Sequence, residues 1–211
     1  MVNQRKTLRK KVRPILSPYC MHVKGHGGVK GALRLIHRQT PRFKFVARFD
    51  VDSYYSSMRH DVLLDILSNN GEDEDLQEIV RSYLDIPDRD AIGAGMVAGG
   101  SISPLLGALY LLPLDCSFDL LVRSGKLYYI RYMDDIIIMA RTPWTLRRAI
   151  KKLFAITGDL SLRMHRKEKY PVGSIEKGFD FLGYQIKPNK RLKPSSESLR
   201  CLVKHAYRLY E

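Results

Sequence analysis

The sequence has few cysteines and no long apolar run. Its longest apolar stretch, 105–112, lies between two prolines and is too short to cross a bilayer. No apolar segment follows the basic first residues, so no secretory signal is expected. The cysteines are far apart and odd in number, which excludes a disulfide framework or a Cys-x-x-Cys metal motif: Cys20, Cys116 and Cys201. We therefore expect a cytoplasmic protein in a reducing compartment, with no membrane partner.

Acidic residues are also scarce relative to basic ones. Lys and Arg number 36 against 22 Asp and Glu, which gives a net charge of +14. Such an excess predicts a polyanionic partner, and nucleic acid is the first candidate. The basic residues gather on separate segments, as in a groove that follows a phosphate backbone: 5–13, 147–152, 163–169 and 187–193. A solvated face explains any single cluster equally well, and a basic helix at a membrane surface is the other alternative.

The apolar pattern predicts an α+β fold. Residues 1–20 are basic with two prolines, and we expect an arm with little regular structure there. Helices are expected around 30–37, 62–67 and 76–84, from Ser103 as N-cap to a kink or end at Pro113, from 142 to 154, and from 196 onward. Strands or hairpins are expected over 43–51, 127–140 and 179–187. This order suits a small mixed sheet with helices packed on one face.

Two adjacent carboxylates stand at the centre of the predicted 127–140 hairpin, where Asn-Gly or Asp-Gly would be usual. At roughly 4 Å and an effective dielectric of about 20, two carboxylates repel by about 4 kcal/mol. Asp134 and Asp135 are thus poorly explained by folding alone, and divalent cations would reverse the sign of the interaction. A solvated acidic turn remains the alternative.

A third carboxylate, Asp50, ends the predicted 43–51 strand. If that strand lies beside the hairpin, the three acids converge. Hard oxygen ligands without His or Cys favour Mg²⁺, with Mn²⁺ possible, over zinc. Two such ions stabilise the attacking and leaving oxygens of phosphoryl transfer, a reaction that needs no protein nucleophile.

Four segments resemble, in order, motifs of the reverse transcriptases, closest to group II intron-like and other bacterial members. Residues 49–55 (Phe-Asp-Val-Asp-Ser-Tyr-Tyr) resemble motif A, and 95–106 resemble motif B. Residues 132–135 (Tyr-Met-Asp-Asp) resemble motif C, and 179–184 resemble motif E, the primer grip. The resemblance implies an RNA-directed DNA polymerase with a ferredoxin-like palm.

The resemblance also implies a division of the chain and a set of partners. Residues 1–41 would be a basic arm and a remnant of the fingers, 42–190 the palm catalytic domain, and 191–211 the start of a thumb helix. The partners would be an RNA template, a DNA or RNA primer and deoxynucleotides. Because the fingers and thumb are short, a protein or RNA partner would complete them.

Individual roles follow from the same resemblance. The implied catalytic and metal-binding set is Asp50, Asp134 and Asp135, with the main-chain carbonyl of Val51 as a further ligand. The nucleotide would be held by Ser53, Tyr54, Tyr55, Gly99 and either Lys167 or Lys169. Primer and template would contact Tyr132, Met133, Phe181, Leu182 and Gly183. Tyr55 would be the steric gate that selects deoxynucleotides, and Gly99 would let a base approach the backbone closely.

Ordinary structural readings stay open for several of these residues. Tyr55 could be a core tyrosine, Met133 simple packing, and the two lysines a charged loop. Motif B departs from the family, with Val97 and Ala98 in place of Pro and Gln, which puts fidelity in doubt.

Two other functions remain open. One is a noncatalytic, maturase-like RNA-binding module in a larger complex. The other is an RNA-dependent RNA polymerase, against which Tyr55 and the Tyr-Met start of motif C argue.

Overall fold

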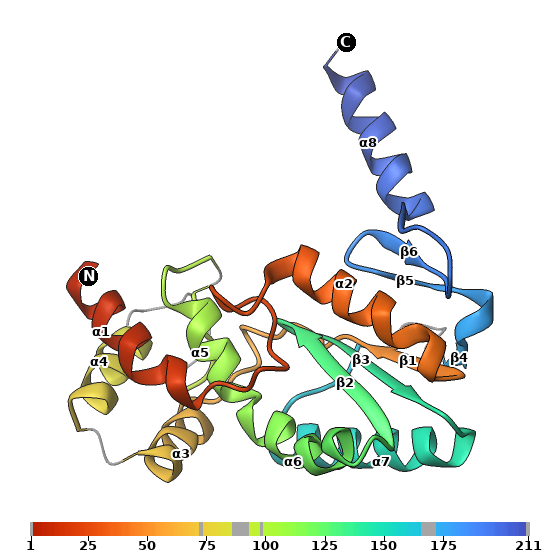
Figure 1. The fold of residues 1–211 in the computed structure, drawn as a ribbon. Helices are drawn as coiled ribbons and strands as arrows, with labels where there is room; N and C mark the ends of the chain where they lie inside the picture. The colour runs from red at the N-terminus through yellow and green to blue at the C-terminus, as the bar shows by residue number, and fades with distance from the viewer. Residues whose placement is uncertain (1, 72–73, 86–92, 98, 166–171, 210–211) are drawn as a thin grey trace.

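A four-stranded antiparallel sheet forms the centre of the molecule (Figure 1). The structure is a computed structural model, and it describes residues 2–71, 74–85, 93–97, 99–165 and 172–209. The strands follow the order β2-β3-β1-β4. Their bounds are β1 (Phe45–Phe49), β2 (Leu127–Tyr132), β3 (Asp135–Ala140) and β4 (Gly173–Ser174). The predicted strand and hairpin are both confirmed.

The register of this sheet brings the end of β1 to the tip of the hairpin. Phe49 pairs with Ile136 across β1 and β3, while Tyr132 pairs with Asp135 across β2 and β3. The chain therefore leaves β1 at Asp50, next to the turn that carries Asp134. Successive side chains of a strand point to opposite faces of the sheet, so a shift of the strand pairing by one residue would move every side chain to the opposite face.

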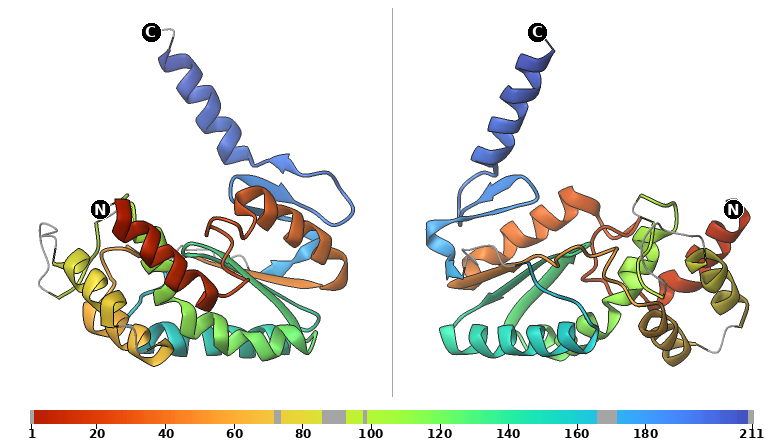
Figure 2. Two further views of the ribbon diagram at one scale, coloured as in Figure 1. Left: turned by 60° about the vertical axis from the view of Figure 1, so that its left-hand side comes forward. Right: turned by 180° about the vertical axis from the view of Figure 1, so that it is seen from behind.

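Apolar side chains cover both faces of the sheet. Helices α6 (Leu112–Arg123) and α7 (Pro143–Asp159) lie on one face, and α2 (Gly28–Gln39) lies on the other (Figure 2). The α6 and α7 face buries Ala47, Phe49, Ile136, Ile138, Phe118 and Leu153. The α2 face buries Val46, Ile137, Met139, Leu33 and Ile36.

The predicted α+β fold is confirmed, but two details of the prediction were wrong. Helices cover both faces of the sheet, because the run Ile136 to Met139 is apolar on both sides. The described strand pairs are antiparallel, not mixed. A single parallel bridge joins Cys20 to Arg131, where the chain before α2 runs along the edge of β2.

The first twenty residues are more regular than predicted. They form α1 (Val2–Val12) and a short 3-10 helix, Arg13–Ile15. Leu8 and Val12 are fully buried, and Leu16 is nearly so. Leu8 and Val12, four residues apart on α1, and Leu16, just after the 3-10 helix, all pack in the main core. The lysines and arginines between them obscure this apolar spacing in the sequence.

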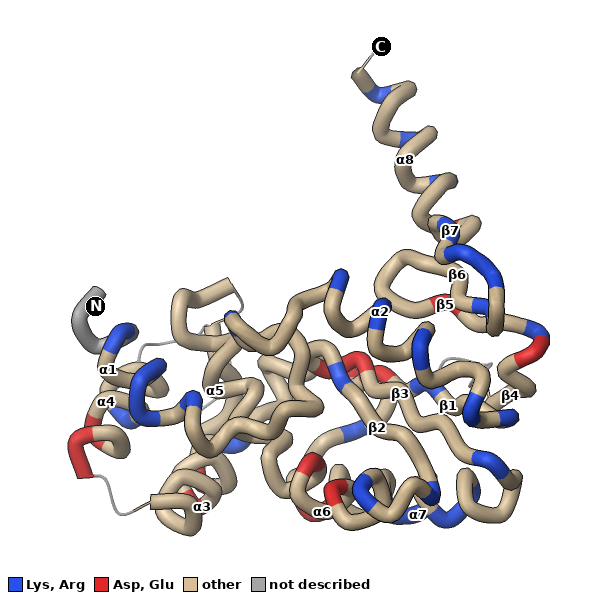
Figure 3. The backbone as a smooth tube through the Cα atoms, viewed as in Figure 1, with Lys and Arg blue, Asp and Glu red and all other residues tan. Residues whose placement is uncertain are grey.

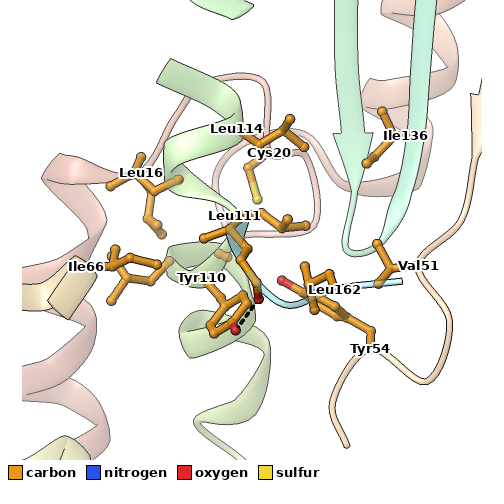
Figure 4. Packing of buried hydrophobic residues seen from close by; sticks show 14 of the residues in the cluster. Leu16, Cys20, Val51, Tyr54, Ile66, Tyr110, Leu111, Leu114, Ile136 and Leu162 are labelled. Carbon is orange, nitrogen blue, oxygen red and sulfur yellow. Dashed lines mark hydrogen bonds between the residues drawn. The ribbon is translucent and has the colours of Figure 1, made fainter. Parts of the chain in front are cut away.

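The remaining helices on the N-terminal side of the molecule occur near their predicted positions. They are α3 (His60–Asn70), α4 (Glu74–Leu84) and α5 (Ser103–Tyr110), and the short 3-10 helix Thr40–Arg42 follows α2. Figure 4 shows the core between them, where Cys20 and Tyr110 pack among leucines. Ile102, not Ser103, is the N-cap residue of α5, and Ser103 Oγ instead donates to the carbonyl of Val97 at 2.6 Å.

The predicted break near Pro113 is confirmed. Helix α5 ends at Tyr110, α6 begins at Leu112, and the two helices are bent by 53°. Among the described residues, no single helix is long and apolar enough to cross a membrane; α5 and α6 pass that test only as a bent pair, on length and composition.

A second, smaller sheet follows β4 and the 3-10 helix Ile175–Lys177. It consists of β5 (Phe179–Phe181), β6 (Tyr184–Ile186) and β7 (Lys193–Pro194), and packs on the α2 side of the main sheet. Helix α8 (Ser196–Arg208) then projects away from the body (Figures 1 and 2) and has no buried residue. Its apolar stripe is open, with Leu202 66% and Tyr207 70% exposed.

Candidate active site

Two of the predicted acids, Asp50 and Asp134, lie near the hairpin tip, close enough for the charge of one to act on the other. Asp134 is partly buried in the turn, and its pKa is raised first by burial and then by the charge of Asp50. Figure 3 shows acidic segments coming together where the end of β1 reaches the hairpin, amid a mostly basic molecule. Asp135 opens β3 opposite Tyr132. The site thus brings negative charges close together, and a bound cation would reduce the repulsion between them.

The carboxylates suit a hard cation. Within the part of the chain that the structure describes, no three His, Cys, Asp or Glu side chains gather closely enough to hold a metal ion by themselves. Mg²⁺ is commonly bound through one or two carboxylates, with water and substrate phosphates completing the shell. Asp50 and Asp134, which provide only oxygen donors, fit that pattern.

The turn between the strands has an unusual backbone. Met133 has φ +56°, and Asp134 is not among the residues with positive φ, as in a type II′ hairpin turn. A side chain other than glycine in this conformation costs about 1–2 kcal/mol. Neighbouring groups must therefore hold the turn in place.

One of those groups is His22, which the sequence did not single out. The backbone N–H of Met133 donates to His22 Nδ1 at 3.0 Å. Nε2 lies 2.8 Å from the carbonyl oxygen of Pro104, so this nitrogen carries the proton and donates. Burial lowers the pKa of His22 to about 4, which keeps the ring neutral.

The second group is a buried ion pair. The side chains of Arg131 and Asp115 are both 0% exposed. Arg131 Nε and one terminal nitrogen each donate to Asp115 at 2.8 Å. The same guanidinium donates to the carbonyls of Ala108 at 2.7 Å and Met133 at 3.1 Å. Tyr129 also donates to Asp115, so one network joins α5, α6, β2 and the turn.

The two predicted tyrosines have different surroundings. Tyr54 is buried and donates to the carbonyl of Gly107 at 2.6 Å. Tyr55 is half-buried, and burial followed by the charge of Asp134 raises its pKa to about 12. A Cβ on Gly107 would lie 3.2 Å from the Tyr54 ring and 3.4 Å from the Tyr55 ring. Tyr55 packs against the main core and also lies near the charge of Asp134, so its readings as a core tyrosine and as a steric gate both stay predictions.

The backbone after β1 is held by the segment that follows α7. The main-chain carbonyl of Asp50 accepts from the N–H of His165 at 2.8 Å, and the N–H of Asp52 donates to the main-chain carbonyl of Arg163 at 2.8 Å. Val51 forms an isolated bridge with Met164. This arrangement places residues 163–165 beside the predicted nucleotide site, where Ser53 has φ +49°.

Three residues discussed from the sequence, Ala98, Lys167 and Lys169, lie outside the described residues. Gly99, which follows Ala98 in the sequence, has φ +80°, a conformation that favours glycine. Apart from its neighbours in the chain, no described residue has an atom within 4 Å of the place where a Cβ would stand. The close approach of a base to Gly99 stays a prediction.

The predicted primer-contact residues lie on two separate elements. Tyr132 ends β2, with its ring edge-on to His22 at 5.9 Å between centroids. Phe181 is buried, while Leu182 and Gly183 form the β5–β6 turn with φ +46° and +79°.

The β5–β6 turn is tied to two other elements. The carbonyl of Gly183 accepts two hydrogen bonds from the start of α8: one from the N–H of Ser195 at 2.8 Å and one from the hydroxyl of Ser198 at 2.9 Å. Arg48 on β1 donates to the carbonyl of Asp180 at 2.6 Å. The predicted primer grip is therefore linked both to α8 and to the strand that ends at Asp50.

Comparisons with known proteins agree with this architecture. The family described as reverse transcriptase (RNA-dependent DNA polymerase) matches residues 4–186. No curated protein matches the chain.

Solved telomerase structures share the fold. Apo telomerase from Candida tropicalis aligns with a TM-score of 0.68 and 14% identity, over 93% of this chain and 41% of that one. Telomerase from Candida albicans, in complex with a TWJ fragment of telomeric RNA, aligns with a TM-score of 0.62 and 13% identity, over 98% and 40%. The chain therefore spans less than half the length of these telomerases, and the likeness establishes the palm fold alone.

Proposed function

The chain belongs to the reverse transcriptase (RNA-dependent DNA polymerase) family, and on that basis we propose that it extends a nucleic-acid primer with deoxynucleotides on an RNA template. The observation that supports this proposal is the register of β1 and β3, which brings Asp50, just after β1, next to the hairpin tip that carries Asp134, where the charge of Asp50 acts on Asp134. A protein that only binds RNA gains nothing from keeping two mutually repelling carboxylates in a partly buried turn.

Each group at the site has a defined task in this reaction. Asp50 and Asp134 would hold Mg²⁺, with Asp135 and the carbonyl of Val51 beside them. The bound ions would offset the charge that develops on the attacking 3′-hydroxyl, the α-phosphate and the departing pyrophosphate. Tyr55 would occupy the space that a ribose 2′-hydroxyl needs, and the Leu182–Gly183 turn would support the primer.

Primer extension by the full chain tests the proposal. We expect Mg²⁺-dependent incorporation of deoxynucleotides on an RNA template with an annealed DNA primer. The open apolar face of α8 favours one specific alternative, a noncatalytic RNA-binding module that acts with a partner. Tight RNA binding without any extension, in Mg²⁺ or Mn²⁺, would establish that alternative and reject the polymerase.

Replacing Tyr55 with alanine is expected to reduce discrimination against ribonucleotides by about tenfold or more, the range that one missing steric contact produces. The half-buried ring lies beside Asp134, so its removal opens space at the acidic centre. The measurement is the ratio of kcat/KM for a deoxynucleotide to that for the matching ribonucleotide.

Tyr54→Phe is the matched control for this change. It removes only the hydroxyl that donates to Gly107, inside the core. We expect it to cost about 1 kcal/mol of stability without changing sugar selection. An unchanged sugar preference in Tyr55→Ala would show that Tyr55 is not the gate.

RNA binding should weaken steeply with salt. The exposed Lys190 and Arg191 lie in the loop between β6 and β7, which His37 of α2 contacts through the carbonyl of Lys190. This loop shares the side of the sheet that carries the predicted primer grip. Changing both residues to glutamine should reduce the slope of log K against log[salt] for single-stranded RNA by about 1.4.

The control for the salt measurement lies on the opposite face of the sheet. Arg147 and Lys151 are exposed on α7 and give the same change of charge when replaced by glutamine. Their double variant should retain the slope of the unmodified protein. Equal slopes for the two double variants would show that charge alone, and not a defined RNA path, governs binding.

A further inference from the structure

We propose that His22 is a positioning residue for the catalytic turn: its neutral ring connects the N–H of Met133 to the start of α5 and so sets the placement of Asp134. This inference rests on the polymerase reaction proposed above. It concerns a residue that lies outside all four motifs and precedes the first of them by more than twenty positions.

The ring is placed for this task by contacts on both nitrogens. Nδ1 accepts from the N–H of Met133 at 3.0 Å, and Nε2 donates to the carbonyl of Pro104 at 2.8 Å. The thiol of Cys20 lies 3.4 Å from Nδ1, and Tyr132 packs edge-on against the ring. His22 therefore joins the two ends of the site, the first turn of α5 and the residue that precedes Asp134.

The backbone that carries His22 is itself fixed to the hairpin. The N–H of Met21 donates to the carbonyl of Arg131 at 2.9 Å, and the N–H of Arg131 donates to the main-chain carbonyl of Tyr19 at 2.9 Å. These bonds form an isolated parallel bridge between Cys20 and Arg131 at the edge of β2. The bridge lies two residues before His22 and fixes the start of the turn that carries it.

The turn requires such support because Met133 holds a left-handed conformation at a position that is not glycine. Its carbonyl is bound by Arg131 and its N–H by His22. With both backbone groups held, the turn has little freedom to relax. Loss of the His22 contact would let the N–H turn toward water and would shift the Asp134 carboxylate away from Asp50.

Both contacts require one tautomer of the neutral ring. A proton on Nδ1 would face the Met133 N–H, donor against donor. Burial is the largest influence that lowers the pKa and so disfavours a second proton on the ring; Arg131 and His26 add to it, while the hydrogen bond to Pro104 and the charge of Asp115 oppose it. A cavity of about 190 Å³ borders the ring, and Arg9 and Lys24 line it as further positive charges.

Two conservative substitutions separate the two contacts. His22→Asn retains an oxygen near the position of Nδ1, which can accept from Met133, but cannot reach Pro104. His22→Gln places its amide nitrogen near the position of Nε2, which can donate to Pro104, but leaves Met133 without an acceptor. His22→Ala loses both contacts.

The proposal predicts an ordered effect on primer extension. Gln and Ala should each lower kcat by about tenfold while KM for the deoxynucleotide stays unchanged, since both variants lose the hydrogen bond that positions Met133. Asn should stay within about threefold of the unmodified protein. Equal losses for Asn and Gln, or no loss for Gln, would overturn the proposal.

A measurement without catalysis distinguishes this inference from the proposed function. Amide hydrogen exchange at Met133, followed by NMR, should become faster in His22→Gln and stay slow in His22→Asn. Urea unfolding of each variant shows whether the fold is intact. If the unmodified chain fails to extend primers, the proposed function is rejected while the exchange result still decides the contact; unchanged exchange in His22→Gln would reject the contact.

Discussion

Replacing Asp134 with asparagine is expected to lower the rate of primer extension by at least about 10³-fold, because several kcal/mol of transition-state stabilisation pass through the cations that this carboxylate would hold. Asparagine has nearly the same shape and keeps one oxygen, but it lacks the charge. Single-turnover extension at saturating deoxynucleotide measures the effect. RNA affinity should be unchanged, since the site is acidic and the binding surface is basic.

Asp65→Asn is the matched control. Asp65 is exposed on α3 and loses the same charge. Its extension rate should equal that of the unmodified protein. An Asp134→Asn variant that extends primers within about tenfold of the unmodified rate would show that the turn carboxylate does not take part in the chemistry.

The same substitution should make the fold more stable at neutral pH. The pKa of Asp134 is raised in the folded state, so the ionised form destabilises the fold where pH exceeds the unfolded pKa, and this penalty disappears as pH falls. Asparagine removes it. A rise in the free energy of unfolding together with lost activity is the pattern expected of a site that sacrifices stability for function.

Replacing Asp115 with alanine is expected to lower the free energy of unfolding by about 3–5 kcal/mol, since it leaves the charge of Arg131 buried without its partner. Both side chains are completely inaccessible to solvent. Tyr129 would lose its acceptor as well. Equilibrium urea unfolding, followed by circular dichroism, measures the change.

Two further variants show whether the unpaired buried charge causes this loss of stability. Glu197→Gln breaks an exposed ion pair with Arg200 on α8 and should cost at most about 1 kcal/mol. The double variant Asp115→Leu with Arg131→Met removes both buried charges and should be more stable than Asp115→Ala. It should nonetheless extend primers poorly, because the carbonyl of Met133 loses its donor. A loss below about 1 kcal/mol for Asp115→Ala would show that water reaches this pair.

Local sequence patterns predicted much of the fold. The alternation ending at Asp50 and the apolar runs around Asp134 specified two neighbouring elements, and family motifs identified them as one site. Helices with a clear apolar stripe, such as α7, were also predicted, and the predicted start at 142 agrees with the structure, where the side chain of Thr142 is the N-cap and accepts from the N–H of Thr145. These features depend on residues near one another in the chain.

The contacts that hold the site could not be predicted in this way. Arg131 stands out as a charge in an apolar strand, but nothing nearby in the sequence indicates Asp115 as its partner. His22 has no local pattern at all, because its partners belong to α5 and to a hairpin more than a hundred residues later. Residues 1–20 were misjudged because their charge concealed a buried stripe. Long-range pairing, not local propensity, decides each of these cases.

Helix α8 is attached to the body mainly through Gly183. Two donors from its first turn meet that one carbonyl, and a Cβ on Gly183 would lie 2.8 Å from the hydroxyl oxygen of Ser198. The helix is about 20 Å long at 1.5 Å per residue. A partner that bound the C-terminal end of α8 and rotated the helix by a few degrees would therefore also move the β5–β6 turn, which is the predicted contact for the primer terminus.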